Sequence, residues 1–306
     1  MIEYSSVEEQ IEKLKRQNLI IEDEMFARDR LTLFGYSNLI KSYRDPYTIM
    51  ESGRKVFRDN VKFEQLCSLY LLDKNLRNAV MASMLDFEEH LKEATADVIA
   101  RAFGTHQDDY LQYRNYQNKK KRVKRFTLAG VLDTMKKALD TDKDPIHHYS
   151  EKYGMVPPWI LFKSIYFSTI INYIDLFKPT ERYKLMERIY DTTSIKTDEK
   201  ALSSLMMDTL FTSLSYRNVA AHGGRIYNFS PNRQFHPTPE LPVLVRGFSQ
   251  LLFLLQQIHY NAPYEHLADC LQREINRHCS EYPSDVTYLG DTLQINIYSQ
   301  GSGKDS

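Results

Sequence analysis

The sequence Ser213-Leu214-Ser215-Tyr216-Arg217-Asn218-Val219-Ala220-Ala221-His222-Gly223-Gly224-Arg225 ends a long amphipathic segment that begins near Thr197. Apolar side chains recur through this segment at intervals typical of one helix face: Leu202, Leu205, Met206, Leu210, Phe211 and Leu214. Where that stripe would continue, the chain has Arg217, and the two glycines after His222 can end a helix in a left-handed conformation. The segment therefore predicts a long helix with a charged C-terminal end, a local inconsistency that is often functional.

The polar residues at this end have the chemistry of a phosphate site. Arg217 is a permanent cation whose planar fork matches a phosphate, and His222 titrates near neutrality, so it can accept or donate a proton. Asn218 lies one helical turn before His222, where its amide could hold one imidazole tautomer. In the alternative interpretation, Arg217 caps helix carbonyls and His222 is satisfied in the core. The pattern alone leaves both interpretations open.

The spacing of the charged pair bears on how a site could form. Arg217 and His222 are five residues apart, which is about 140° around an ideal helix and a poor angle for one converging site. Either the helix end is distorted at the glycines, or the pair meets its counterpart from a second subunit. The second option predicts a composite site at a two-fold axis of a homodimer.

An arginine followed five residues later by a histidine is a weak signal by itself. The pattern occurs three times in the chain, and the other two copies are Arg101 to His106 and Arg273 to His278. Only the copy at 217–222 combines a following Asn, small residues before His, a preceding apolar helix and a Gly-Gly stop.

Several stretches resemble a known family. The segment Arg217-Asn218-Val219-Ala220-Ala221-His222 resembles the Arg-polar-x-x-x-His signature of HEPN-domain ribonucleases, and the chain more narrowly resembles the Abi-like abortive-infection proteins of the AbiD/AbiF type. The matching elements are residues 14–19 with Phe34-Gly35-Tyr36, Leu69-Tyr70-Leu71-Leu72-Asp73-Lys74-Asn75-Leu76-Arg77, and Pro158-Trp159. The resemblance implies an all-helical, metal-independent RNA endonuclease, usually dimeric, with Arg and His in the active site. It also raises the possibility of an antitoxin or a small regulatory RNA as a partner.

Composition excludes some other classes. The chain has 40 basic and 40 acidic residues among its 306, so no global charge draws it to nucleic acid or membrane, and any RNA site is a local patch. Cys67, Cys270 and Cys279 are too few and too scattered for a disulfide framework, which fits a cytoplasmic protein. The two most apolar stretches, around 160–177 and 241–258, are interrupted by polar residues and indicate buried helices instead of membrane spans.

The apolar periodicity and the low Gly and Pro content predict a mostly helical protein. The resemblance further implies an all-α, HEPN-like helical bundle. We expect an N-terminal helical extension over 1–59 that starts with a capping box at Ser6, and a helical domain over 60–262. Residues 263–306 are expected to form a C-terminal helix, a small β-hairpin about a Gly-Asp turn in 286–298, and a disordered tail.

Within the helical domain, residues 63–103 are predicted to form one long helix or two nearly collinear ones, with Asp73 among the charges on the solvent side. Further helices are expected over 158–177 and 241–260, and residues 36–59 are expected to be rich in loops.

A basic insertion at about 110–125 is the second candidate RNA contact. It contains six cations in seven residues, Lys119, Lys120, Lys121, Arg122, Lys124 and Arg125. Upstream, Tyr110, Tyr113 and Tyr116 offer rings for base stacking, so the segment predicts phosphate binding. The alternative is a solvated loop. Arg225 and Tyr227 lie close enough in sequence to border the motif, although capping of the helix end would explain them equally.

No metal or cofactor is expected. The adjacent histidines His147 and His148 lack the further ligands that a zinc site requires, so a loop or packed pair is expected there. Our hypothesis is RNA cleavage by the substrate's own 2′-hydroxyl, with His222 as general base or acid, Arg217 neutralising phosphoryl charge, and Asn218 orienting His222 or binding phosphate. The alternative is a non-catalytic helical module that binds RNA or a protein partner.

Overall fold

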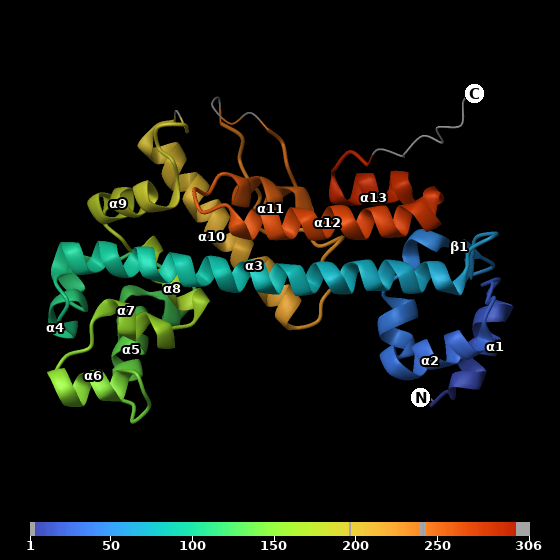
Figure 1. Ribbon diagram of the computed structural model, residues 1–306, viewed down its shortest axis with the longest axis horizontal. Coiled ribbons are helices and arrows are strands. Elements are labelled where there is room, and N and C mark those ends of the chain that lie inside the picture. Colours follow the sequence, from blue (N-terminus) through green and yellow to red (C-terminus); the bar gives the residue numbers. More distant parts are fainter. Residues whose placement is uncertain (1–3, 196, 239–240, 242, 298–306) are drawn as a thin grey trace. The chain divides into compact units, whose positions relative to one another are not determined.

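The computed structural model describes residues 4–195, 197–238, 241 and 243–297, and it is all-α apart from one short hairpin in that part of the chain (Figure 1). The predicted fold class is therefore confirmed. The chain divides into two compact units. Unit 1 comprises Met1–Ala79, Gly223–Phe229 and Ala268–Ser306, and unit 2 comprises Val80–His222 and Ser230–Leu267.

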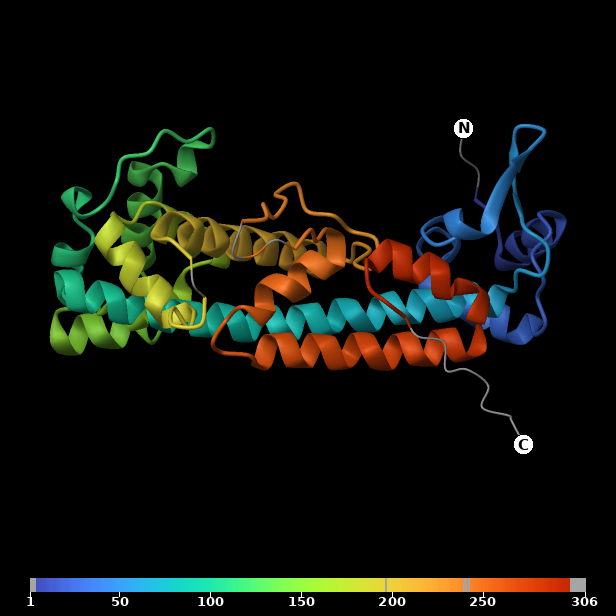
Figure 2. The same ribbon diagram turned by 90° about the horizontal axis from the view of Figure 1, so that it is seen from above.

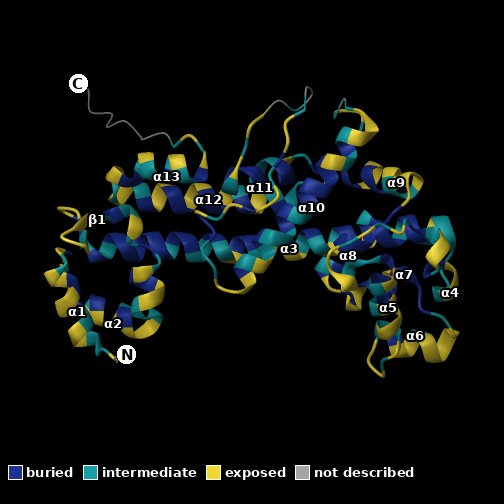
Figure 3. Ribbon diagram, turned by 180° about the vertical axis from the view of Figure 1, so that it is seen from behind, coloured by how far each residue is buried: buried dark blue, intermediate teal, exposed yellow. Residues whose placement is uncertain are grey.

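The longest element is α3, Phe63–Phe103, a single helix of 41 residues that contributes to both units. Its predicted apolar stripe is buried throughout, with side chains that are fully enclosed: Leu66, Leu69, Leu76, Val80, Met84, Phe87 and Leu91. Figure 3 shows this burial along the α3 ribbon. Asp73 departs from the prediction, because it is 0% exposed and not on the solvent side.

Unit 1 contains the helices that flank the first part of α3. They are α1 (Val7–Arg16), α2 (Glu24–Phe34), η1 (Ser37–Lys41), η2 (Asp45–Tyr47), η6 (Pro283–Asp285) and α13 (Val286–Leu293), together with the second part of α12 (Ala262–Glu281). The predicted capping box is present, since the Ser6 hydroxyl accepts from the Glu9 N–H and the Glu9 carboxylate accepts from the Ser6 N–H.

The predicted hairpin at 286–298 is wrong for the residues that the structure describes. Residues 286–293 form α13, because Leu289 and Leu293 are one helical turn apart and both are buried, and Gln294 ends the helix in the left-handed conformation. Residue 298 lies outside the described residues. The observed hairpin is β1 (Thr48–Glu51) with β2 (Arg54–Phe57), in a region where we expected loops. Its turn residues Ser52 and Gly53 both have positive φ, as a tight hairpin turn requires.

Unit 2 contains the long helix α10 and a set of shorter helices, in addition to parts of α3 and α12. Apart from α3 and α12, they are α4 (Gln107–Tyr110), η3 (Tyr113–Asn115), η4 (Lys124–Phe126), α5 (Leu128–Leu139), α6 (Ile146–Tyr153), α7 (Pro158–Leu161), η5 (Phe162–Ser164), α8 (Phe167–Asp175), α9 (Pro179–Ile189), α10 (Glu199–Ala221) and α11 (Gly247–Gln256). Helix α10 packs against α8, α9 and α11 (Figure 2). None of the described helices is long and apolar enough to cross a membrane.

Two predicted helices in unit 2 have different bounds in the structure. The helix expected over 158–177 is broken between η5 and α8, where Ile165 and Tyr166 are extended; this buries Ile165 and leaves Tyr166 77% exposed. The helix expected from 241 begins at Gly247, because Arg246 before it is extended. Residue 242 is outside the described part of the chain.

Candidate functional site

The motif lies on the last turn of α10. The helix begins at the Asp198 cap, whose carboxylate accepts from the Ala201 N–H at 2.7 Å, and it continues to Ala221. The N–H of His222 still donates to the Asn218 carbonyl at 3.1 Å, and Gly223 then stops the helix with a φ of 71°. The predicted helix and its glycine stop are confirmed. Because the hydrogen-bonding is regular through the motif, Arg217 and His222 leave the helix about 140° apart.

Arg217 is half-buried, and one of its guanidinium N–H donors is shielded from water. Its Nε is buried and has no hydrogen-bond partner among the described residues. One turn earlier, the buried Ser213 hydroxyl is likewise unpartnered in that part of the chain. Buried donors of this kind cost free energy until an acceptor satisfies them. A phosphate oxygen is a suitable acceptor for a guanidinium N–H. Sequence reasoning did not single out Ser213, since a serine within a helix gives no signal of burial.

His222 and Asn218 are both exposed. The alternative interpretation, in which the His222 imidazole is hydrogen-bonded in the protein core, is therefore wrong. No hydrogen bond joins the two side chains within the described residues, so the tautomer-holding contact suggested for Asn218 is not formed in this conformation. Both side chains are accessible to a ligand that approaches the end of α10.

Arg225 and Tyr227 belong to unit 1 and differ in accessibility. Arg225 is half-buried, and its Nη1 donates to the Ser42 carbonyl. Tyr227 is 1% exposed, and its hydroxyl lies 2.9 Å from the hydroxyl of Tyr288. Burial raises the pKa of Tyr227 far above its ordinary value. The Tyr227 ring is thus not available to stack on a base, and its place among the predicted RNA contacts is corrected to one of packing.

The basic insertion is divided between paired and exposed cations. Lys119 and Lys121 both form ion pairs with Asp175 at the end of α8. Burial raises the pKa of Asp175, but the hydrogen bonds from Lys121 and Lys119 outweigh it and hold that pKa below its usual range. The remaining four cations are exposed: Lys120, Arg122, Lys124 and Arg125. The predicted contact surface therefore reduces to these four.

The tyrosines before the insertion are not equivalent either. Tyr110 and Tyr116 are buried, at 0% and 5% exposure, while Tyr113 is 49% exposed. Only Tyr113 of the three can offer its ring to a base.

The ion pairs of the basic insertion lie near the start of α10, whereas the motif lies at its end. Arg182 approaches Asp175 at 3.6 Å and also donates to the Ser203 hydroxyl at 3.3 Å, near the start of α10. Ser203 precedes Arg217 by fourteen residues, a helix rise of about 21 Å. Within one chain, the ion pairs of the insertion and the motif are therefore at different ends of this helix.

The two other Arg and His pairs are accounted for by the fold. His278 is 0% exposed, and its two ring nitrogens lie 2.9 Å from the Ser68 hydroxyl and 2.9 Å from the Asp285 carboxylate. His106 is the N-cap of α4, where its Nδ1 accepts from the Asp108 N–H at 3.2 Å.

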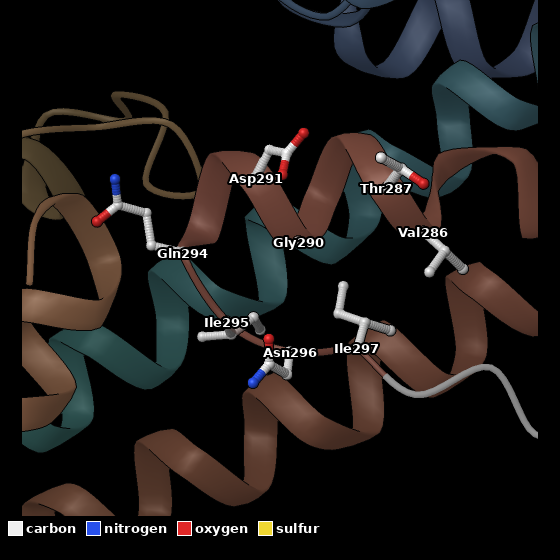
Figure 4. Close-up of a pocket in the computed structure, with 8 residues that line it drawn as sticks. All are labelled: Val286, Thr287, Gly290, Asp291, Gln294, Ile295, Asn296 and Ile297. Carbon is white, nitrogen blue, oxygen red and sulfur yellow. The ribbon is translucent and has the colours of Figure 1, made fainter.

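Two further features lie outside the motif and the basic insertion. In the described part of the chain, no three His, Cys, Asp or Glu side chains come together as a metal site, and His147 and His148 are exposed on α6, not in a loop. A hollow of about 800 Å³ lies beside α13 in unit 1 (Figure 4). It is wide open, Asp291 is the one charged residue that lines it, and none of the predicted site residues does.

The sequence matches the family model of Abi-like proteins over residues 29–228. The match covers most of the chain and includes α3 and the whole motif of α10. The chain belongs to the Abi-like family, with an all-α fold and an Arg and His motif at the end of α10. No curated protein and no solved structure matches it.

Proposed function

We propose that this protein is a metal-independent endoribonuclease of the HEPN type that acts in abortive-infection defence against phage. The observation that carries the proposal is the end of α10, where exposed His222 lies about 1.4 helical turns after Arg217, whose buried Nε has no partner among the described residues. A proton carrier and an anion-binding cation on one helix end are the groups that phosphodiester cleavage in RNA needs. Membership of the Abi-like family supports the same assignment.

In the proposed reaction, a general base takes the proton of the ribose 2′-hydroxyl, and O2′ attacks the adjacent phosphorus. The bond from phosphorus to O5′ breaks, a general acid protonates the leaving O5′, and a 2′,3′-cyclic phosphate remains. His222 is one of these two groups. Arg217 neutralises the charge that builds on the phosphoryl oxygens, and the exposed amide of Asn218 binds a phosphate oxygen.

We propose further that the site is completed by a second subunit. The regular helix keeps Arg217 and His222 about 140° apart, so one chain presents them in different directions. A two-fold axis beside the end of α10 would bring together two copies of each residue, and the two imidazoles would serve as base and acid. The exposed cations of the basic insertion would bind RNA outside the cleaved linkage.

The test of the chemistry is cleavage of single-stranded RNA in EDTA by wild type, His222→Ala and His106→Ala. We expect His222→Ala to lose about 10²-fold or more of the rate, as for removal of a general acid or base, and the His106→Ala control to retain it. Cleavage by His222→Ala at the wild-type rate would overturn the assignment.

The test of the shared site is a mixing experiment with co-refolded subunits. If both imidazoles are needed, an equal mixture of wild type and His222→Ala retains about a quarter of the activity, because only wild-type dimers are active. Retention of about a half would show that each chain acts alone.

A further inference from the structure

The part of helix α3 that belongs to unit 1 places two charged residues against one short segment. Asp73 and Arg77 are one helical turn apart, so they share a face of α3. Asp73 is 0% exposed, and its Oδ1 accepts hydrogen bonds from the backbone N–H groups of Ile226 and Tyr227, both at 2.8 Å. Its Oδ2 accepts from the Tyr43 hydroxyl at 2.6 Å. A side chain distant in sequence thus holds two consecutive peptide groups.

Arg77 holds the beginning of the same segment. Its Nη1 donates to the Gly223 carbonyl at 2.7 Å and lies 3.5 Å from the Gly224 carbonyl. Gly223 has the positive φ that ends α10, so the guanidinium binds the turn at the point where the chain changes direction. The carboxylate and the guanidinium therefore fix residues 223–227 from opposite ends, through backbone groups alone.

Burying a charged side chain costs free energy, so packing alone does not explain this arrangement. Burial raises the pKa of Asp73, and the hydrogen bonds from Tyr43 and the two N–H groups, with the charge of Arg77, offset that effect only in part. Apolar side chains of similar size often stabilise an interior as well as a buried charge does. A buried carboxylate and a half-buried guanidinium aimed at one five-residue segment instead specify its conformation.

We propose that Asp73 and Arg77 are positioning residues for His222. Gly223 follows His222 directly, so a clamp on residues 223–227 fixes the backbone at the C-terminal side of the imidazole. Effective proton transfer depends on such placement, and a misplacement of about 1 Å costs orders of magnitude in rate. This role rests on the proposed ribonuclease function, whereas the clamp itself does not.

The experiment compares Arg77→Ala, Asp73→Ala and Asp73→Asn with Asn78→Ala. Asn78 is exposed on the same helix and serves as the matched control. The asparagine of Asp73→Asn keeps an oxygen that can accept from Ile226 and Tyr227, so it is the conservative variant. Arg77 is partly exposed, so Arg77→Ala should still fold. This variant therefore tests the clamp even if Asp73→Ala does not fold.

Two measurements are made on each folded variant. Hydrogen exchange of the peptide covering 223–228 reports the clamp, and we expect Asp73→Ala to raise the exchange of the Ile226 and Tyr227 amides by about tenfold or more. In Arg77→Ala and Asp73→Ala, kcat for RNA should fall by about tenfold to 100-fold while KM stays within about twofold. Asp73→Asn should recover much of both signals, and Asn78→Ala should match wild type.

The outcomes separate the two levels of the proposal. Unchanged exchange in both Arg77→Ala and Asp73→Ala would overturn the clamp. Raised exchange with an unchanged kcat would overturn the positioning of His222. If wild type cleaves no RNA, the proposed function fails, and the exchange data alone decide whether the clamp exists.

Discussion

Of the three histidines that follow an arginine by five residues, His222 and His278 have opposite surroundings in the structure. His222 ends α10 with an exposed side chain, whereas His278 is fully enclosed on α12 with both ring nitrogens engaged, by Ser68 and Asp285. An imidazole held in the interior on both sides stabilises the fold, while an exposed one can exchange a proton with a ligand. The spacing by itself therefore defines no site, because burial and hydrogen-bond partners determine what each histidine can do.

The largest expected difference between the two pairs is in the arginines. Arg217→Ala should lower kcat for RNA cleavage by about 10² to 10³-fold, because the charge that forms on the phosphoryl oxygens loses its counter-charge. The Arg273 side chain is 66% exposed, and its Nε lies 3.6 Å from the Glu274 carboxylate. Arg273→Ala is therefore the matched control, and its kcat should stay close to that of wild type. Single-turnover kinetics in EDTA measure both. Equal losses in the two variants would remove the distinction between the pairs.

For stability the order of the two pairs is reversed, because replacing His278 should cost more than replacing His222. His278→Ala removes a fully enclosed ring together with its hydrogen bonds to Asp285 and Ser68, so the free energy of unfolding should fall by about 2–4 kcal/mol. His222→Ala is an exposed substitution and should change it by less than about 0.5 kcal/mol. Urea unfolding followed by circular dichroism distinguishes them. A large loss of stability in His222→Ala would mean that this imidazole is structural after all.

A smaller effect is expected in the basic insertion, where exposed and paired cations alternate. Replacing Lys120 and Arg122 together by Ala should weaken binding of single-stranded RNA by about threefold to tenfold and lower the salt slope of log K by about one to two. Replacing Lys119 and Lys121 should instead reduce stability, because the Asp175 carboxylate loses two of its three cationic partners and keeps only Arg182. Filter binding across a salt series tests this. An unchanged salt slope in the first double variant would exclude Lys120 and Arg122 from the RNA contact.

The smallest expected effect is a pH dependence of the buried histidine site. Burial raises the pKa of Asp285, but hydrogen bonds from His278, Tyr47 and Gln65 outweigh it, so the folded pKa is below the ordinary 3.8. A carboxylate with a depressed pKa contributes stability above the unfolded pKa of about 4 and loses it as the pH falls through the lower folded value. The stability difference between wild type and Asp285→Asn should therefore shrink as the pH falls from about 5 to about 3. A difference independent of pH would contradict this origin.

The sequence predicted those features that depend on local spacing. Apolar residues at helical intervals located α3 and α10, and the glycines after His222 located the end of α10. The same rule explains the error at 286–298, where Gly290-Asp291 indicated a turn although Leu289 and Leu293 already had helical spacing.

Features that depend on distant partners could not be predicted. The acidic side chain of Asp73 indicated solvent exposure, and its burial is explained only by donors from residues 43, 226 and 227. Lys119 and Lys121 belonged to a run of free cations until the fold brought Asp175 beside them. The unpartnered Nε of Arg217 is likewise a property of packing, because only burial removes it from water.

In the proposed reaction, the exposed imidazole at the end of α10 moves a proton so that a ribose 2′-hydroxyl can attack the adjacent phosphodiester. The direct measurement is single-turnover cleavage, in EDTA, of two RNAs that differ by one 2′-deoxy substitution at the cleaved nucleotide. Wild type should cut the all-ribose strand to a 2′,3′-cyclic phosphate and leave the substituted linkage intact, and His222→Ala should cut the all-ribose strand about 10²-fold or more slowly than wild type. Cleavage of the 2′-deoxy linkage by wild type, or of the all-ribose strand by His222→Ala at the wild-type rate, would contradict the account.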